Sequence, residues 1–236
     1  MGEPGQNIKI GAVTIGQSPR VDVTPEFEAA LGINAELVQA GALDGLSPEE
    51  TRQFAPQGGE CFLVTRMRDG TEVRVAERHI HRRVQDCVRG LEAASVDLIV
   101  LFCTGEFPRL DSRCLILKPD VLMKHLIPGI LPQGRLGIVL PAPEQAAAMK
   151  KKWQSTGLEM VFDAASPYTG TAADFRAAAR RLAAGKVDLI VPDCIGFTGE
   201  MKRILREESG KPVILPRTLL GRVCGELLDA RGGRPW

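Results

Sequence analysis

Residues 96–105 (VDLIVLFCTG) and residues 187–196 (VDLIVPDCIG) are identical at seven of ten aligned positions. In each stretch, a short apolar run typical of a buried parallel strand leads into a cysteine, and a glycine follows two residues later. An aspartate before three apolar residues is common wherever a helix leads into a parallel strand, so VDLIV alone carries little weight. The cysteine and glycine after both runs are more specific. They predict two related halves, each with one thiol at the end of a strand.

The segments around both stretches alternate short apolar runs with longer amphipathic ones, a pattern typical of βα units. In the first half we expect strands at 9–16, 36–39 and 97–102, helices at 25–31 and 77–94, and a hairpin of strands 61–66 and 72–76 around Asp69-Gly70. In the second half we expect strands at 136–140, 158–162, 188–192 and 213–215, and helices at 143–156, 172–184, 198–208 and 216–228. The predicted fold class is α/β, with two pseudo-symmetric Rossmann-like halves and mostly parallel sheets.

A Gly- and Pro-rich segment, PGILPQG at residues 128–134, marks the seam between the halves. We expect a first half at residues 1–131, which contains the inserted hairpin, and a second half at residues 132–236. The helix at 216–228 could pack back on the first half.

The composition excludes several classes of function. The 236 residues include 30 basic and 29 acidic side chains, a formal charge of +1, which gives no excess positive field for nucleic acid. The longest apolar run, Leu98–Cys103, is six residues long, far below the roughly 20 needed to span a bilayer. Met1–Gln6 lacks the basic and apolar regions of a signal peptide. We therefore expect a cytoplasmic enzyme or small-molecule binder, with neither nucleic acid nor membrane as a partner.

The six cysteines lie in a long chain without a C-x-x-C pair, so we expect free thiols. His79 and His81 are two apart on a predicted helix and point to different faces, which argues against a metal site. Four cysteines fall on apolar faces and are interpreted as buried structural residues: Cys61, Cys87, Cys114 and Cys224.

The other two cysteines, Cys103 and Cys194, suit proton transfer at carbon. Parallel strands end at the edge of the sheet where α/β folds bind ligands, so two facing halves would present two thiols across one cleft. One thiolate would remove a proton next to a carboxylate or carbonyl, and the opposite thiol would protonate the other face, with no cofactor required. Free thiols have pKa values of about 8.5, so the base needs help. We expect a helix N-terminus after each strand to supply it.

Further candidates lie in the loops at the same edge. Arg20, after the first strand, could clamp a substrate carboxylate with help from Ser18, or could be a surface arginine after a turn proline. Tyr168, the single tyrosine, could donate to an enolate oxygen or simply pack. Thr104 and Thr198 could bind substrate oxygens or cap helices.

Five segments together resemble the AroM family: residues 11–26, 41–50, 64–75, 101–108 and 192–197. This resemblance implies the fold of the aspartate/glutamate racemase superfamily, which includes hydantoin racemases, maleate isomerase and arylmalonate decarboxylase. Most members carry active-site cysteines from each of two pseudo-symmetric halves, and Cys103 and Cys194 fall at those places. The turns that follow the cysteines, Thr104-Gly105 and Ile195-Gly196, are then candidates for substrate binding.

Two features depart from the superfamily pattern. Amino-acid racemases usually have Asn-Thr after the first cysteine, whereas this chain has Thr104-Gly105, which leaves the substrate open. Glu106 and Asp193 lie beside the cysteines in sequence, and a nearby carboxylate opposes thiolate formation.

The leading hypothesis is therefore a cofactor-independent racemase or isomerase of a small carboxylate or carbonyl compound, with Cys103 and Cys194 as its acid/base pair. A decarboxylase or lyase that uses a single cysteine is the alternative within the same fold. A non-catalytic small-molecule sensor is the alternative from another class. A homodimer is the commonest assembly for such chains.

Overall fold

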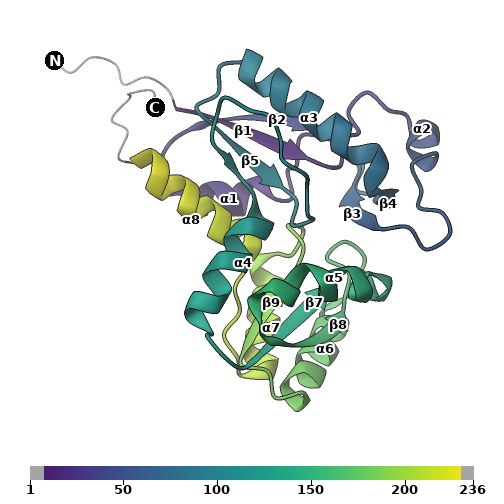
Figure 1. The fold of residues 1–236 in the computed structure, drawn as a ribbon, viewed down its shortest axis with the longest axis vertical. Coiled ribbons are helices and arrows are strands. Elements are labelled where there is room, and N and C mark those ends of the chain that lie inside the picture. The colour runs from purple at the N-terminus through teal and green to yellow at the C-terminus, as the bar shows by residue number, and fades with distance from the viewer. Residues whose placement is uncertain (1–7, 230–236) are drawn as a thin grey trace.

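The chain folds around two parallel sheets, one in each half of the sequence (Figure 1). This computed structural model describes residues 8–229, so the N-terminal stretch Met1–Gln6 lies outside the described residues. The first sheet has the order β2-β1-β5-β6, with β1 at Lys9–Thr14, β2 at Glu36–Gly41, β5 at Leu98–Phe102 and β6 at Ile116–Leu117. The second has the order β8-β7-β9, with β7 at Arg135–Leu140, β8 at Glu159–Ala164 and β9 at Leu189–Pro192. The predicted α/β class with mostly parallel sheets is confirmed.

The two repeated stretches occupy equivalent places. β5 pairs with β1 in the first sheet, and β9 pairs with β7 in the second, both in parallel. Gly11 lies opposite Ile99, and Gly137 lies opposite Ile190, 91 residues further on. A Cβ at Gly11 would lie 3.3 Å from Ile99, and one at Gly137 would lie 3.3 Å from Ile190. The same close approach therefore recurs in both sheets.

Helices cover both faces of the sheets. Those of the first half are α1 (Thr24–Leu31), α2 (Pro48–Arg52), α3 (Glu77–Ala93) and α4 (Pro119–Ile130). Those of the second half are α5 (Ala146–Trp153), α6 (Ala172–Ala184), α7 (Gly199–Ser209) and α8 (Pro216–Asp229). Because side chains alternate along a strand, Ile99 and Leu101 of β5 pack in one cluster with residues of α3, whereas Leu98 and Val100 pack with α1 and α8.

Several predicted elements differ from the structure. The helix expected at 143–156 is broken into α5 with a 3-10 turn at each end, Pro143–Gln145 and Gln154–Thr156. The strand expected at 213–215 is a single parallel bridge between Ile190 and Val213, since Pro216 already begins α8. α4 was not predicted, and its Pro128 lies inside a helix although it begins the segment interpreted as the seam.

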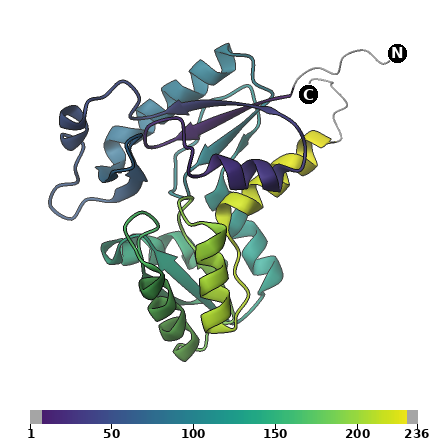
Figure 2. The same cartoon turned by 180° about the vertical axis from the view of Figure 1, so that it is seen from behind.

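α8 crosses back and packs against α1 of the first half (Figure 2). Two glycines allow the helices to approach closely. A Cβ at Gly221 would lie 2.6 Å from the carbonyl oxygen of Phe27, and one at Gly225 would lie 2.1 Å from that of Leu31.

The predicted hairpin is present, with β3 at Phe62–Arg66 paired antiparallel to β4 at Glu72–Ala76. Its edges contact the second half. Gln145 donates to the carbonyl of Phe62 at 3.1 Å, and Arg74 forms an ion pair with Glu144 at 3.1 Å. The Ser166 hydroxyl also donates to Glu72. The hairpin thus joins the two halves on one side of the molecule.

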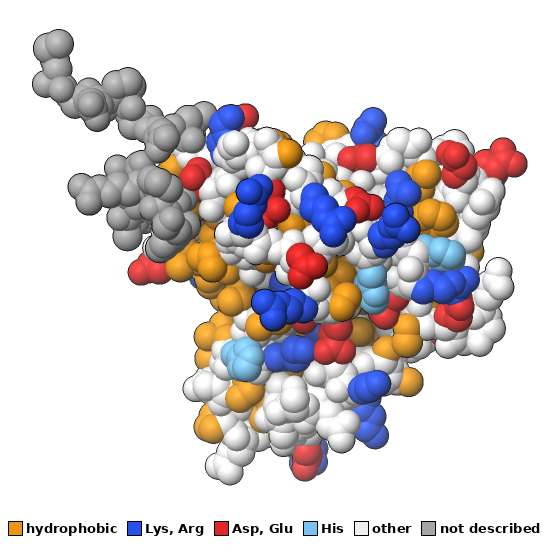
Figure 3. Space-filling view, turned by 45° about the horizontal axis from the view of Figure 1, so that its top comes forward, with side chains coloured by type: hydrophobic (Ala, Val, Ile, Leu, Met, Phe, Trp, Pro, Cys, Tyr) orange, Lys and Arg blue, Asp and Glu red, His pale blue; other side chains and the backbone are white. Residues whose placement is uncertain are grey.

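On the face drawn in Figure 3, Lys and Arg side chains are interspersed with Asp and Glu. Within residues 8–229, the structure has no helix that is long and apolar enough to cross a membrane.

Candidate active site

Cys103 and Cys194 occupy matching positions just beyond the carboxyl ends of β5 and β9. Both are buried, with 6% and 7% of their surfaces exposed. Each sulfur accepts a backbone N–H from the glycine two residues later, Gly105 at 3.3 Å and Gly196 at 3.4 Å. This explains why cysteine and glycine recur together in the sequence repeat: the turn aims an N–H at each thiol.

Burial raises the pKa of both thiols above the ordinary range, because it disfavours the charged thiolate. The N–H groups of Gly105 and Gly196 act in the opposite direction. A negative charge on Cys194 further raises the pKa of Cys103. The two thiols therefore act on one another electrostatically, and a thiol paired with a thiolate is favoured over two thiolates.

The prediction of a helix N-terminus after each cysteine is right on one side only. Thr198, four residues after Cys194, caps α7 through a hydrogen bond from the N–H of Met201. After Cys103 the chain instead runs as a loop to the short strand β6. The first half therefore has no helix dipole to stabilise a Cys103 thiolate from its own turn.

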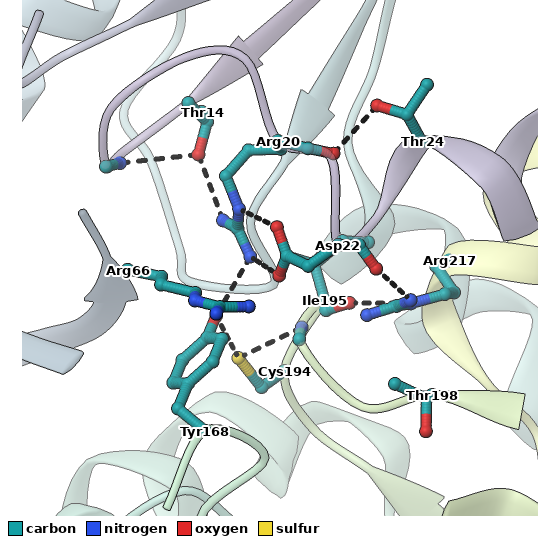
Figure 4. Close-up of polar contacts among 12 residues, drawn as sticks. Thr14, Arg20, Asp22, Thr24, Arg66, Tyr168, Cys194, Ile195, Thr198 and Arg217 are labelled. Carbon is teal, nitrogen blue, oxygen red and sulfur yellow. Dashed lines mark hydrogen bonds and ion pairs between the residues drawn. The ribbon is translucent and has the colours of Figure 1, made fainter. Parts of the chain in front are cut away.

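Tyr168 connects Cys194 to the first half (Figure 4). Its hydroxyl oxygen lies 3.8 Å from the Cys194 sulfur and accepts a hydrogen bond from Arg20 Nη2 at 3.2 Å. Both Tyr168 and Arg20 lower the pKa of Cys194 and so partly offset its burial. Burial together with the Cys194 charge raises the pKa of Tyr168 itself well above its usual range. The phenol therefore keeps its proton at neutral pH.

Arg20 is buried, and its donors already have partners in this structure. Asp22 accepts from Nε at 2.8 Å and from Nη2 at 2.7 Å, and Thr14 accepts from Nη1 at 3.2 Å. Burial alone would raise the pKa of Asp22, but the hydrogen bonds and charge of Arg20 lower it below its ordinary value. The fork that would clamp a substrate carboxylate is thus occupied by Asp22.

Ser18 lies two residues before Arg20, and the hydrogen bonds that it donates go to Asp44 rather than to Arg20 or Asp22. Its hydroxyl donates to Asp44 at 2.5 Å, and its backbone N–H donates to the same carboxylate at 2.8 Å. Ser18 and Asp44 therefore fix the shape of the loop that carries Arg20.

Neither acidic neighbour of the cysteines stands as an isolated charge. Glu106 is exposed and forms an ion pair with Lys124 at 2.7 Å. Asp193 is buried and forms an ion pair with Lys152 at 2.7 Å.

The residues after the cysteines leave donors open. Within residues 8–229, the backbone N–H groups of Thr104 and Ile195 form no hydrogen bond to another protein group. These N–H groups belong to the residues that directly follow the two cysteines in the chain.

Sequence reasoning missed three polar residues that support the site: Asp22, Lys152 and Arg217. Arg217 of α8 is fully buried and donates to the carbonyl of Ile195 at 3.0 Å and to that of Asp22 at 2.7 Å (Figure 4). Lys152 and Arg217 contact chain that is distant in sequence, and no local motif signals such contacts. Asp22 binds Arg20, only two residues before it, through a turn that the sequence pattern does not reveal.

The other cysteines only partly follow the prediction of buried structural residues. Cys224 is buried, Cys87 and Cys114 are half-buried, and Cys61 is exposed. The prediction is wrong for Cys61 because this residue lies just before β3, in the inserted segment, rather than inside the strand.

A cavity of about 820 Å³ lies between α2 and the hairpin, lined in part by Arg52, Met67 and Val73. It does not contain either candidate cysteine. Within the described part of the chain, no group of three or more His, Cys, Asp or Glu side chains is placed to hold a metal ion.

The sequence matches one known protein family. The AroM protein family matches residues 10–228. A search of curated protein sequences finds no significant match.

Solved structures with a similar fold include three enzymes. Glutamate racemase RacE1 from Bacillus anthracis has a TM-score of 0.60 and 11% identity over 98% of this chain and 85% of its own. The aspartate racemase of Picrophilus torridus has a TM-score of 0.57 and 14% identity over 98% and 96%. Maleate cis-trans isomerase from Nocardia farcinica has a TM-score of 0.60 and 17% identity over 95% and 94%, and was solved as a cysteine-to-serine mutant with a covalently bound succinylcysteine intermediate. At these identities the likeness establishes the fold alone.

Proposed function

The chain belongs to the AroM protein family, and on that premise we propose that it is a cofactor-independent racemase or isomerase of a small carboxylate or carbonyl compound. Cys103 and Cys194 serve as its acid/base pair. The observation that carries the proposal is their matched placement: one buried thiol from each half, each receiving a glycine N–H, with the charge of Cys194 raising the pKa of Cys103.

The reaction moves two protons. The thiolate of one cysteine takes the proton from the carbon next to the carboxylate or carbonyl, and the electron pair of that C–H bond moves onto the adjacent oxygen. The opposite thiol then gives its proton to the other face of the carbon. The product is inverted at that carbon, and the cysteine that began as thiolate ends as thiol.

In the resting protein, Cys194 has more neighbouring groups that favour its thiolate than Cys103 has. The Tyr168 hydroxyl and the Arg20 charge both favour its thiolate. Arg20 acts here through Tyr168 and as a nearby cation, while Asp22 and Thr14 hold it in place.

The N–H groups of Thr104 and Ile195 have no protein partner among the described residues and directly follow the cysteines in the chain, which supports a role in binding the substrate oxygens. Gly105 and Gly196 complete the two turns by fixing the sulfurs. Ser18 shapes the adjoining loop through Asp44.

A substrate screen tests the proposal. Enantiopure α-amino acids, hydantoins and small dicarboxylates are incubated with the protein, and inversion is followed by circular dichroism or cis–trans change by ultraviolet absorbance. We expect turnover of one class that is lost in both Cys103→Ser and Cys194→Ser and kept in Cys61→Ser, because Cys61 is exposed and outside the site. Full turnover in both serine variants would overturn the two-cysteine mechanism, and loss in only one would favour a single-cysteine reaction.

A further inference from the structure

One lysine joins the two cysteine loops across the halves of the molecule. Lys152, in the last turn of α5, is 3% exposed. Its Nζ donates to the carbonyl of Thr104 at 2.6 Å and to the two carboxylate oxygens of Asp193 at 2.8 and 2.7 Å. Thr104 directly follows Cys103, and Asp193 directly precedes Cys194. A single ammonium group thus contacts the chain beside each candidate cysteine.

Each N–H of the Lys152 ammonium has a hydrogen-bond acceptor, and both oxygens of the Asp193 carboxylate accept a hydrogen bond. An ammonium has three N–H bonds, which match its three acceptors here. The indole N–H of Trp153 donates to Asp193 at 2.8 Å, so the carboxylate also has a neutral donor. Replacing a buried ion pair by apolar residues of similar volume is often neutral or stabilising. Stability alone is therefore a weak reason for placing Lys152 and Asp193 here.

The two charges of the pair are placed next to different cysteines. Lys152 binds the loop of Cys103, whereas Asp193 directly precedes Cys194 in the chain. Lys152 accordingly lowers the pKa of Cys103, whereas Asp193 raises the pKa of Cys194. One member of the pair thus acts on each thiol, and the two effects have opposite sign.

The other groups near the thiols favour a thiolate at Cys194 over one at Cys103. Asp120 raises the pKa of Cys103. Tyr168 and Arg20 lower the pKa of Cys194. Without the buried pair, these groups would favour Cys194 as the thiolate more strongly.

We propose that Lys152 and Asp193 form a positioning pair that clamps the two cysteine loops together and balances the two thiols, so that either one can act as the base. This inference rests on the proposed two-thiol reaction, in which each direction needs the opposite cysteine as base. Lys152 and Asp193 do not touch the substrate; they act through the cysteine loops.

The test measures each thiol separately and needs no substrate. The rate of iodoacetamide alkylation is followed from pH 6 to 11 by mass spectrometry of the peptides that contain Cys103 and Cys194. The proteins compared are the wild type, the double variant Lys152→Met/Asp193→Asn, and Lys151→Met as a matched control. Lys151 precedes Lys152 in the same helix but is exposed.

We expect the double variant to move the alkylation midpoint of Cys103 to higher pH and that of Cys194 to lower pH. Their relative alkylation at a fixed pH should change by about threefold or more, which corresponds to roughly half a pKa unit. Lys151→Met should leave both midpoints in place. Midpoints that stay fixed, or that move in the same direction, in a folded double variant would overturn the balancing role.

A second comparison covers a double variant that does not fold. Asp193→Asn alone keeps the Lys152 cation and removes the nearby negative charge, so the Cys194 midpoint should fall; an unchanged or higher midpoint would overturn the inference. Because alkylation does not depend on turnover, the balancing role can fail while the substrate screen still supports racemisation. The converse result is equally distinguishable.

Discussion

At the scale of single residues, the proposed site contains side chains that shift the pKa values of its two thiols. Cys103 and Cys194 are both buried and would be poor bases without help. Tyr168 supplies that help to Cys194 by contacting its sulfur while accepting a hydrogen bond from Arg20. The Tyr168 hydroxyl therefore links the charged Arg20 of the first half to the Cys194 thiol of the second half.

Tyr168→Phe should lower kcat by roughly tenfold or more, since a hydrogen bond involving a charged group contributes about 1.5–3 kcal/mol. The lost hydroxyl leaves the Cys194 thiolate less stable, so the rising limb of the pH–rate profile should move to higher pH. Steady-state kinetics across pH would measure both effects. A change in KM alone, with kcat and the pH profile intact, would show that the hydroxyl acts only in binding.

The raised thiol pKa values also predict how the wild type responds to pH. Burial raises the pKa of both cysteines, so the thiolate fraction is small at pH 7 and kcat/KM should rise about tenfold per pH unit towards pH 8.5 and beyond. A rate plateau below pH 7 would contradict this expectation.

The same pKa shift makes the free energy of unfolding depend on pH. The folded state disfavours the thiolates, so the contribution of the two neutral thiols to the free energy of unfolding is complete below the unfolded pKa of about 8.5. This contribution is lost as the pH rises towards the folded pKa values.

The repeat in the sequence predicts the two cysteines and their glycines because each turn is local and has the same length in both halves. Asp22, Lys152 and Arg217 could not be predicted in the same way. The partners of Lys152 and Arg217 lie in distant segments, and a buried lysine within the run Lys150–Lys152 resembles its exposed neighbours in sequence. Likewise, Arg20 carries the expected charge, but its binding to Asp22 depends on the turn between them.

At the scale of elements, periodicity predicts most strands and helices, while the connections are less predictable. The hairpin at 62–76 and helix α6 follow directly from the Asp69-Gly70 turn signal and the amphipathic pattern. α4 was missed because prolines at both ends of the segment resemble a linker, although Pro119 is well suited to the first turn of a helix. The division at residues 131 and 132 stays a prediction.

The contact between α1 and α8 gives a prediction at this scale. In Gly225→Ala, the added Cβ would lie 2.1 Å from the Leu31 carbonyl, so the helices must separate. We expect the free energy of unfolding to fall by about 1–3 kcal/mol. Gly90→Ala is the matched control, because Gly90 lies inside α3 with nothing within 4 Å of its added Cβ, and it should stabilise the protein by roughly 0.5–1 kcal/mol. Equal effects of both substitutions in urea unfolding would argue against the close helix contact.

At the scale of the whole molecule, polar contacts between the halves join the segments that carry the two proposed catalytic cysteines. Tyr168 reaches Arg20, Lys152 reaches Thr104, and the hairpin contacts Gln145. Glu26 of α1 adds a further link by accepting the N–H of Gly199, the first residue of α7, at 2.8 Å. A carboxylate at a helix N-terminus is favourable because of the positive end of the helix dipole.

Glu26→Ala should therefore lower the free energy of unfolding by about 1 kcal/mol. Glu28→Ala is the control, since Glu28 lies on the same helix and is exposed. Chemical denaturation of both variants would measure the difference. If Glu28→Ala destabilises the protein as much as Glu26→Ala does, the link to α7 contributes nothing specific.

In the proposed reaction, two thiols from two halves exchange protons with opposite faces of one carbon. Its most direct test is proton exchange by NMR in deuterated water, with one enantiomer of a substrate from the screen and with wild type, Cys103→Ser, Cys194→Ser and Cys61→Ser. We expect wild type and Cys61→Ser to replace the α-proton by deuterium and to place the deuterium in the inverted product, whereas both site variants abolish inversion. Deuterated, inverted product formed at the wild-type rate by either site variant would overturn the two-thiol reaction.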